Sequence, residues 1–158
     1  MRIGHGFDAH RLVAGRPFVL GGIEIPFERG PLGHSDADVL AHALSDALLG
    51  ACALGDLGAH FPDSDERWRG ADSMRLLEAC AIMVAERGYG IGNVDATVVV
   101  QLPKLAPHIA AIRANVARVL RIETDAVSVK AKTSEGMGYT GDGTGIAAYA
   151  VAVLTHSR

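Results

Sequence analysis

The sequence has few aromatic residues, no cluster of basic residues and no long apolar stretch. Phe, Tyr and Trp make up only 5% of the 158 residues, which argues against a surface on which nucleic-acid bases stack. The formal net charge is −3, so we expect no nucleic-acid partner. No stretch reaches the ~18 apolar residues that a membrane-spanning helix requires, so we expect no membrane association.

Cysteine is also scarce. Cys52 and Cys80 are the only two, and they form no Cys-x-x-Cys motif. This usage is typical of reduced, buried thiols rather than of a disulfide framework or a closed zinc site. Residues 1–10 carry Arg2, Asp8 and two histidines instead of the apolar segment of a signal peptide. We therefore expect a cytoplasmic protein.

The length and composition predict one globular domain that spans residues 1–158. A chain of 16.5 kDa in which 49% of residues are hydrophobic buries enough surface to fold without disulfides or metal. Any metal site would therefore serve chemistry rather than folding.

The hydrophobic pattern predicts an α+β fold, a two-layer sandwich of one mixed sheet with helices on one face. The first strand is expected to run into a glycine-punctuated loop by His10. Ser35 is expected to start the first helix, and either Asp72 or Ser73 to start the second. The expected elements are strands near 1–10, 94–100, 126–131 and 146–154, a hairpin at 18–27, and helices near 38–49, 72–88 and 105–120.

One carboxylate and two histidines have the spacing of a metal site. Asp8 and His10 are two residues apart, so an extended backbone points both side chains to one side. With His42 they make three ligands suited to zinc and leave a fourth position open. Asp38 and Asp46 lie four residues on either side of His42 and are candidates to orient its ring. The alternative is that His42 is an ordinary hydrogen-bonding residue of a helix.

Two polar segments are further candidates for function. Residues 55–70 alternate carboxylates with glycine and proline, and so long a loop in a compact domain is usually functional. Residues 132–136 combine a lysine, two hydroxyls and Glu135 at the end of a predicted strand. Such groups can hold phosphate oxygens and Mg²⁺, although a simple polar turn is the alternative.

Several motifs together resemble the 2-C-methyl-D-erythritol 2,4-cyclodiphosphate synthase family, in the same order and spacing over essentially the whole chain. They are RIGHGFDAHRL, GHSDADVLAHALSDALLGACALGDLGAHFPD, GADS, GNVDATVV, PKLAPHI, VSVKAKTSEGMGYTG and GIAAYAVAVL. The second motif is long enough to be highly specific.

The resemblance implies a lyase of the non-mevalonate isoprenoid pathway. Its substrate is 4-diphosphocytidyl-2-C-methyl-D-erythritol 2-phosphate, and its products are the 2,4-cyclodiphosphate and CMP. The family is a homotrimer with active sites between adjacent subunits. It uses one Zn²⁺ per subunit, and Mg²⁺ or Mn²⁺ on the substrate diphosphate.

The resemblance also assigns roles to residues of this chain. Asp8, His10 and His42 resemble the zinc ligands, and Glu135 resembles the residue that places the second ion. His34 and Thr133 resemble the groups that position the reacting phosphates. The further implied substrate contacts are Ser35, Asp56, Gly58, Phe61, Asp63, Asp65, Val100, Pro103, Lys104, Ala106, Lys132 and Tyr139.

One position departs from the family pattern. The family usually has Arg-Gly-Glu where this chain has Asp142, Gly143 and Thr144. The arginine lies near the central cavity of the family's trimer, where isoprenoid diphosphates are proposed to bind. A carboxylate there would repel such anions, so we expect weak or no binding of geranyl or farnesyl diphosphate.

Two other functions use the same residues. A zinc-dependent phosphoesterase that hydrolyses a nucleotide diphosphate needs the same metals together with an activated water. A sensor of terpenoid diphosphates is the alternative without catalysis, and Asp142 weighs against it.

Overall fold

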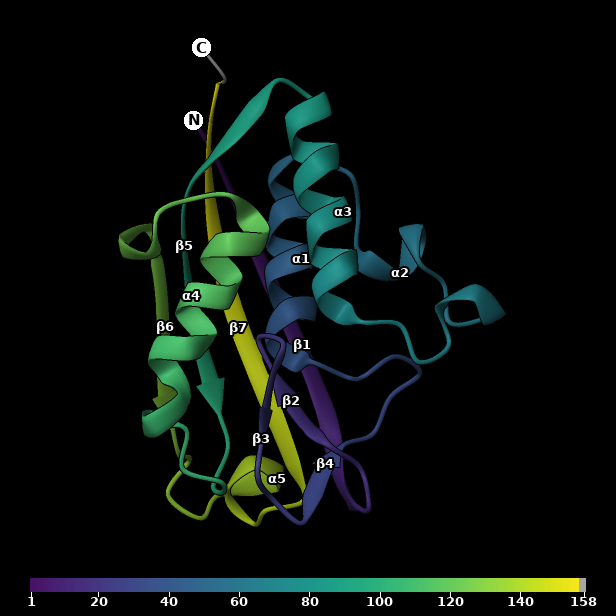
Figure 1. Ribbon diagram of the computed structural model, residues 1–158, viewed down its shortest axis with the longest axis vertical. Coiled ribbons are helices and arrows are strands. Elements are labelled where there is room, and N and C mark those ends of the chain that lie inside the picture. The colour runs from purple at the N-terminus through teal and green to yellow at the C-terminus, as the bar shows by residue number, and fades with distance from the viewer. Residues whose placement is uncertain (157–158) are drawn as a thin grey trace.

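The computed structural model describes residues 1–156 and has the predicted α+β architecture (Figure 1). The main sheet has five strands in the order β4-β1-β7-β5-β6. Only β5 and β6 run parallel, so the sheet is mixed. Its strands are β1 (Arg2–Ala14), β4 (Arg29–Pro31), β5 (Tyr89–Val99), β6 (Val127–Lys132) and β7 (Gly145–His156). A separate hairpin pairs β2 (Phe18–Leu20) with β3 (Ile23–Ile25), as the sequence predicted.

Three helices form the second layer, on one face of the main sheet (Figure 1). They are α1 (Val39–Ala51), α3 (Ser73–Glu86) and α4 (Ile109–Leu120), and α4 follows a short 3₁₀ turn, η2 (Ala106–His108). Another turn, η3 (Thr124–Ala126), precedes β6, and the short α5 (Gly138–Gly141) precedes β7. Among the described residues, no helix is long and apolar enough to cross a membrane.

Helix α1 packs directly onto β1 because two glycines leave room for it. A Cβ on Gly4 would lie 1.9 Å from the carbonyl oxygen of Ala47, and one on Gly6 would lie 1.9 Å from that of Ala43. The prediction that these glycines interrupt the strand is wrong. β1 continues unbroken to Ala14, because the glycines serve close packing rather than a turn.

We predict that Gly6→Ala destabilises the protein by about 3 kcal/mol or more, because the new methyl group meets helix backbone that has no room to move. Gly50→Ala is the matched control within α1. Its Cβ would meet only the His5 carbonyl oxygen at 3.8 Å, so helix propensity should raise the stability by about 1 kcal/mol. Urea unfolding of both variants measures the difference, and equal stabilities would contradict this account of the packing.

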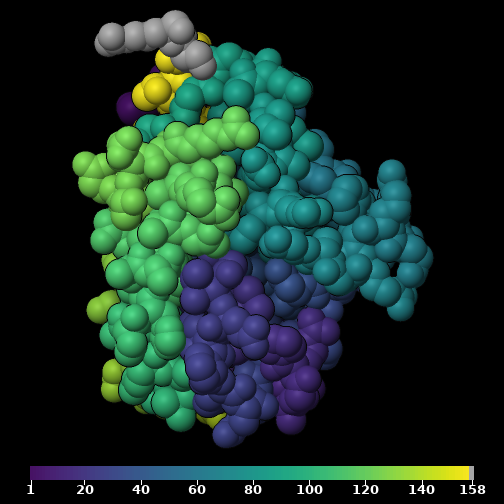
Figure 2. All heavy atoms as spheres, in the orientation of Figure 1, coloured from purple at the N-terminus to yellow at the C-terminus, as the bar shows by residue number. Residues whose placement is uncertain are grey.

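The connection between α1 and α3 projects from the body of the molecule (Figures 1 and 2). It contains two short helices, α2 (Leu57–His60) and η1 (Glu66–Trp68), and both begin at aspartates whose side chains accept backbone N–H groups. This segment is the long loop that the sequence analysis marked as functional.

The face of the sheet opposite the helices carries exposed apolar side chains. Phe7 and Tyr149 lie on the neighbouring strands β1 and β7, with ring centroids 5.0 Å apart, and both are more than 40% exposed. Ile3 and Val151 on the same two strands are also exposed. Contiguous apolar surface of this kind usually marks an interface with another protein chain.

The buried layer between the sheet and the helices is the hydrophobic core. It includes both cysteines, which are free and buried, and burial raises the pKa of the Cys80 thiol to about 11. Such a thiol stays protonated and unreactive near neutral pH, as expected from the cysteine usage.

Candidate metal centre and adjoining cavities

Three side chains from two elements converge beside the middle of β1. Asp8 and His10 project from β1 toward the start of α1, where His42 lies one turn into the helix. Asp8 Oδ2 lies 2.8 Å from His42 Nδ1 and 2.9 Å from His10 Nε2, and the two nitrogens are 3.4 Å apart. In the described part of the chain, this is the group of His, Cys, Asp and Glu side chains whose ligand atoms lie close enough to hold one metal ion, within 4.8 Å of one another. The spacing argument from the sequence had selected the same three residues.

The arrangement fits a tetrahedral divalent ion. Ligand atoms that surround zinc at 2.0–2.1 Å lie about 3.3 Å from one another, close to the three distances observed. The outer nitrogen of each imidazole also has an oxygen partner. His10 Nδ1 lies 3.0 Å from the Leu32 carbonyl oxygen, and His42 Nε2 lies 2.9 Å from Ser73 Oγ. Such partners orient histidines that bind metals.

The charges of Asp8 and His42 shift each other's pKa. Burial alone would raise the pKa of Asp8, but hydrogen bonds and charge interactions with the two histidines lower it to about 2. Burial likewise opposes a charge on His42, yet the hydrogen bond and the charge of Asp8 raise the pKa of the imidazole above its ordinary value. Without metal, the Asp8 carboxylate therefore stabilises a proton on the His42 ring. A metal must displace this proton in order to bind.

We predict that the metal-free protein loses stability as the pH rises through the pKa of folded His42. A raised pKa means that the folded state binds this proton more tightly than the unfolded state. The stabilisation is complete below the ordinary value of 6.5 and is lost above the raised value. The lowered pKa of Asp8 limits the stability at acidic pH. Its stabilisation is present above pH 3.8 and is lost as the pH falls toward about 2.

Urea unfolding of chelator-treated protein at several pH values measures this effect. The wild type should lose stability relative to His42→Ala as the solution becomes alkaline. A constant difference between the two proteins would contradict the coupling between Asp8 and His42.

The structure corrects the predicted roles of Asp38 and Asp46. Asp38 is fully buried and caps α1, where its carboxylate accepts N–H groups from Ala41 at 3.1 Å and Gly22 at 2.7 Å. The Asp46 carboxylate accepts the Leu57 N–H at 2.7 Å. Both carboxylates therefore hold backbone loops, and neither orients an imidazole. Asp38, and not Ser35, is the cap that starts α1.

A cavity of about 500 Å³ opens beside the three converging side chains. Its walls come from β1, α1, α3, the loop before α1 and the projecting connection. Ten of the predicted site residues line it, namely Asp8, His10, His34, Ser35, His42, Asp46, Asp56, Gly58, Phe61 and Asp63. We call it the metal-side cavity. Four of these residues are aspartates, so an anionic ligand requires cations in order to bind here.

Two buried nitrogens at this cavity have no hydrogen-bond partner among residues 1–156. They are Nε2 of His34 and Nε1 of Trp68. The Trp68 ring packs edge-on against Phe61, with centroids 5.0 Å apart. Unpaired buried donors are costly in a folded protein, and they commonly mark positions where a ligand completes the hydrogen bonds.

A second group of predicted residues lies around another cavity. Val100, Pro103, Lys104, Ala106, Lys132 and Thr133 line a cavity of about 190 Å³ at the ends of β5 and β6, together with Leu105 and Ala131. We call it the β6-end cavity. It shares no lining residue with the metal-side cavity. One chain therefore does not bring the two predicted halves of the substrate site into one cavity.

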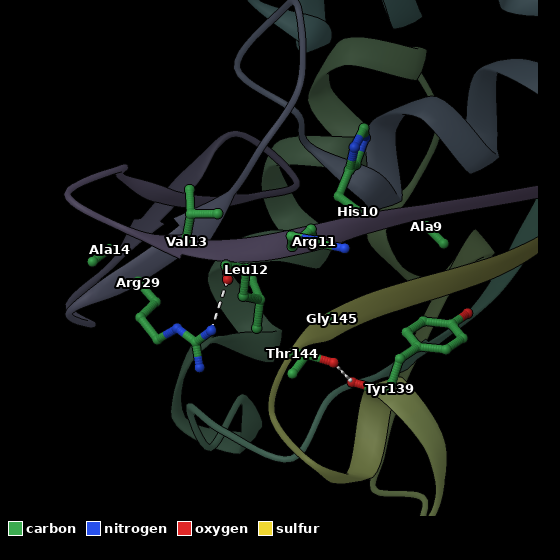
Figure 3. A pocket seen from close by; sticks show the side chains of 10 residues that line it. All are labelled: Ala9, His10, Arg11, Leu12, Val13, Ala14, Arg29, Tyr139, Thr144 and Gly145. Carbon is green, nitrogen blue, oxygen red and sulfur yellow. Dashed lines mark hydrogen bonds between the residues drawn. The ribbon is translucent and has the colours of Figure 1, made fainter.

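Besides the buried Asp38, three predicted residues lie outside both cavities. Glu135 is on the loop after β6, where its carboxylate accepts the Thr133 hydroxyl at 2.8 Å. Asp65 pairs with Arg67 on the exposed surface. Tyr139 lines a third cavity, of about 700 Å³, with Arg29 and Thr144. Figure 3 shows His10 on the other side of β1 from Tyr139 and Arg29.

The loop that departs from the family pattern borders this third cavity. The Thr144 hydroxyl and N–H donate to the Asp142 carboxylate and hold its pKa below the ordinary value. The Arg29 guanidinium donates to the carbonyl oxygens of Gly143 and Leu12. The charged Asp142 carboxylate therefore accepts hydrogen bonds from its own turn.

Two features of this site were not predicted from the sequence, namely the contact of Ser73 with His42 and the aromatic wall of the metal-side cavity. Ser73 contacts the outer nitrogen of His42, but it is 31 positions away and was considered only as a possible start of α3. Trp68 lies in the segment marked as functional, and it was not singled out there. Only the packing of α1 against α3 reveals the first contact.

Comparison with known proteins identifies the class. The sequence profile of the YgbB family matches residues 1–155, so the chain belongs to the YgbB family. Two relatives carry a particular name, 2-C-methyl-D-erythritol 2,4-cyclodiphosphate synthase. The one from Trichlorobacter lovleyi is 58% identical over 154 residues, which cover 98% of each chain. The one from Burkholderia thailandensis is 60% identical over 153 residues, which cover 97% of this chain and 94% of the relative.

Solved structures agree with this result. A CDP-bound form of 2C-methyl-D-erythritol-2,4-cyclodiphosphate synthase matches with a TM-score of 0.91 and 42% identity, over 98% of this chain and all of that one. The bifunctional IspDF of Campylobacter jejuni matches with a TM-score of 0.95 and 39% identity. That match covers 98% of this chain and 42% of the longer protein. These findings confirm the family resemblance inferred from the motifs.

Proposed function

We propose that the chain converts 4-diphosphocytidyl-2-C-methyl-D-erythritol 2-phosphate to 2-C-methyl-D-erythritol 2,4-cyclodiphosphate and CMP. This is a lyase reaction of the non-mevalonate isoprenoid pathway. The observation that carries the proposal is the convergence of Asp8, His10 and His42 beside the metal-side cavity. It occurs in a chain that matches synthases of this name over nearly its full length. We expect the enzyme to act in the cytoplasm.

The three converging side chains would hold one Zn²⁺ per subunit, and Glu135 would hold Mg²⁺ or Mn²⁺ on the diphosphate. Bound divalent ions act as Lewis acids on phosphate oxygens and neutralise the charge of the departing CMP. Two imidazoles and one carboxylate are a ligand set that zinc favours, and three ligands leave a position open for a substrate oxygen.

The protein's own task is to position a flexible polyanion. The 2-phosphate is already ionised near neutral pH, so it can attack the β-phosphorus without a protein nucleophile or general base. His34 would donate a hydrogen bond to a phosphate, which would satisfy its unpaired Nε2. Ser35 and Asp63 would hold the methylerythritol portion, and Asp56 and Gly58 the ribose. Holding the reacting groups together can contribute up to ~7–11 kcal/mol.

The separation of the two cavities supports a site shared between subunits. The β6-end cavity would bind cytosine, mostly through main-chain groups, with Thr133 on the phosphates. If the substrate spans both cavities, a second copy of the chain can supply the second one. The exposed Phe7 and Tyr149 on the bare face of the sheet supply apolar surface for such an assembly. We propose a homotrimer with three equivalent sites.

Product analysis tests the proposal. The protein is incubated with the cytidyl substrate, Zn²⁺ and Mg²⁺ in ¹⁸O-water, and the products are followed by ³¹P NMR and mass spectrometry. We expect CMP and the cyclic diphosphate, without solvent oxygen in either. Incorporation of ¹⁸O would instead identify a phosphoesterase, and no release of CMP would favour a sensor of terpenoid diphosphates.

A further inference from the structure

The two ring nitrogens of His42 face different surroundings. Nδ1 points to Asp8 Oδ2 at 2.8 Å and to His10 Nε2 at 3.4 Å, which makes it the nitrogen on the side of the proposed metal. Nε2 points the other way, to Ser73 Oγ at 2.9 Å. A histidine binds a metal through Nδ1 only after that atom has lost its proton, and the neutral ring then keeps its proton on Nε2.

The Ser73 hydroxyl lies between His42 and a carboxylate. Ser73 is fully buried, and its hydroxyl donates to Asp36 Oδ1 while its backbone N–H donates to Asp36 Oδ2 at 3.0 Å. A hydroxyl has one proton and two lone pairs. Because the proton is directed at Asp36, Ser73 Oγ can only accept from His42. Ser73 Oγ is therefore a fixed acceptor for a proton on Nε2, which is the proton that the ring keeps once a metal displaces the proton on Nδ1.

We propose that Ser73 and Asp36 are positioning residues that orient the His42 ring by accepting its Nε2 proton, so that Nδ1 points to the metal. This inference rests on the proposed metal site and goes beyond it, because neither residue lines the metal-side cavity. Asp36 acts through Ser73. The carboxylate fixes the hydroxyl, and the hydroxyl fixes the imidazole.

The backbone holds Asp36 and Ser73 in place. Asp36 precedes α1, and its N–H donates to the Ala71 carbonyl oxygen at 3.1 Å. Asp72 caps α3 and accepts the Met74 N–H, which sets Ser73 as the first helical residue. The contacts thus join the start of α1 to the start of α3. His10 is held differently, because its outer nitrogen meets the Leu32 carbonyl oxygen, which no side-chain substitution removes.

Ser35 is the one competing partner near His42 Nε2. Its hydroxyl oxygen lies 3.2 Å from this nitrogen and also accepts the Ala37 N–H at 3.1 Å. Ser35 lines the metal-side cavity, whereas Ser73 does not, and no described carboxylate accepts its proton. Ser35→Ala should therefore leave metal affinity close to that of the wild type, although it can weaken substrate binding.

The direct test is the Zn²⁺ affinity of the full chain, measured by competition with a chromophoric chelator. Ser73→Ala and Asp36→Asn should each weaken binding by roughly 10–100-fold, as loss of an outer partner of a ligand usually does. Ser45→Ala is the matched control. Ser45 is equally buried and donates one hydrogen bond, at 2.8 Å, to the Ala41 carbonyl oxygen, without a contact to His42.

Two further measurements separate positioning from general destabilisation. The Ser73→Ala/Asp36→Asn double variant should bind Zn²⁺ about as weakly as Ser73→Ala alone, because Asp36 acts through the hydroxyl. ¹H–¹⁵N NMR of histidine-labelled protein loaded with Zn²⁺ should show a slowly exchanging Nε2–H of His42 in the wild type. In Ser73→Ala this proton should exchange faster with water.

Each outcome has a distinct meaning. Wild-type affinity in Ser73→Ala, or an equal loss in Ser45→Ala, would overturn the inference. Wild-type affinity in Asp36→Asn alone would remove Asp36 from it. If the wild type binds no Zn²⁺ at all, the proposed metal site fails first.

Discussion

His42→Ala is expected to lose the bound metal and nearly all turnover while the protein stays folded. The substitution removes one of three converging ligands, so metal affinity should fall by more than the ~100-fold that loss of an outer partner can cost. Without the metal, the aspartates of the metal-side cavity face an anionic substrate with nothing to offset the repulsion. The fold should persist, because α1 is held by its apolar residues and by the Asp38 cap.

Three measurements check this expectation. Elemental analysis gives the metal content, CMP release gives the activity, and circular dichroism with urea unfolding reports on the fold. His108→Ala is a suitable control, because it removes a histidine that makes no cap hydrogen bond at the start of α4. Full activity in His42→Ala, or in wild-type protein stripped of metal, would contradict the assigned role of the ligands.

The convergence of the three candidate metal ligands could be predicted from the sequence because their geometry is local. Asp8 and His10 share a side of one strand, which the alternation of an extended backbone guarantees. His42 joins them because α1 packs against β1. The same local reasoning misassigned Asp38 and Asp46. Residues four apart on a helix share a face, but a carboxylate binds whichever donor is nearest, and here backbone N–H groups of Gly22 and Leu57 are nearest.

Features that depend on two distant elements escaped prediction. Ser73 meets His42 only because α1 and α3 pack side by side, and no spacing within either helix encodes that contact. The glycines of β1 were misread for a similar reason. Glycine usually indicates a turn, whereas Gly4 and Gly6 make room for a helix that begins more than thirty residues later. The order of strands and helices was predictable, because apolar periodicity is a local signal.

The second large effect concerns two inactive variants that should restore activity to each other. His42→Ala damages the metal-side cavity, and Ala131→Phe should block the β6-end cavity, because Ala131 lines that small space and is exposed. If each active site combines one cavity from each of two neighbouring subunits, a mixed trimer contains some sites with both halves intact. Random mixing in equal amounts should make about one quarter of all sites functional.

The experiment denatures the two variants together and refolds them with Zn²⁺ and Mg²⁺, and CMP release is then compared with that of each variant refolded alone. A recovery of about one quarter of wild-type activity supports sites shared between subunits. Mixing folded variants without denaturation is the control, since exchange between assembled trimers should be slow. No recovery after refolding, with assembly of the mixed protein shown by size-exclusion chromatography, would mean that each chain builds its own complete site. The two cavities would then have to be joined by a rearrangement within one chain.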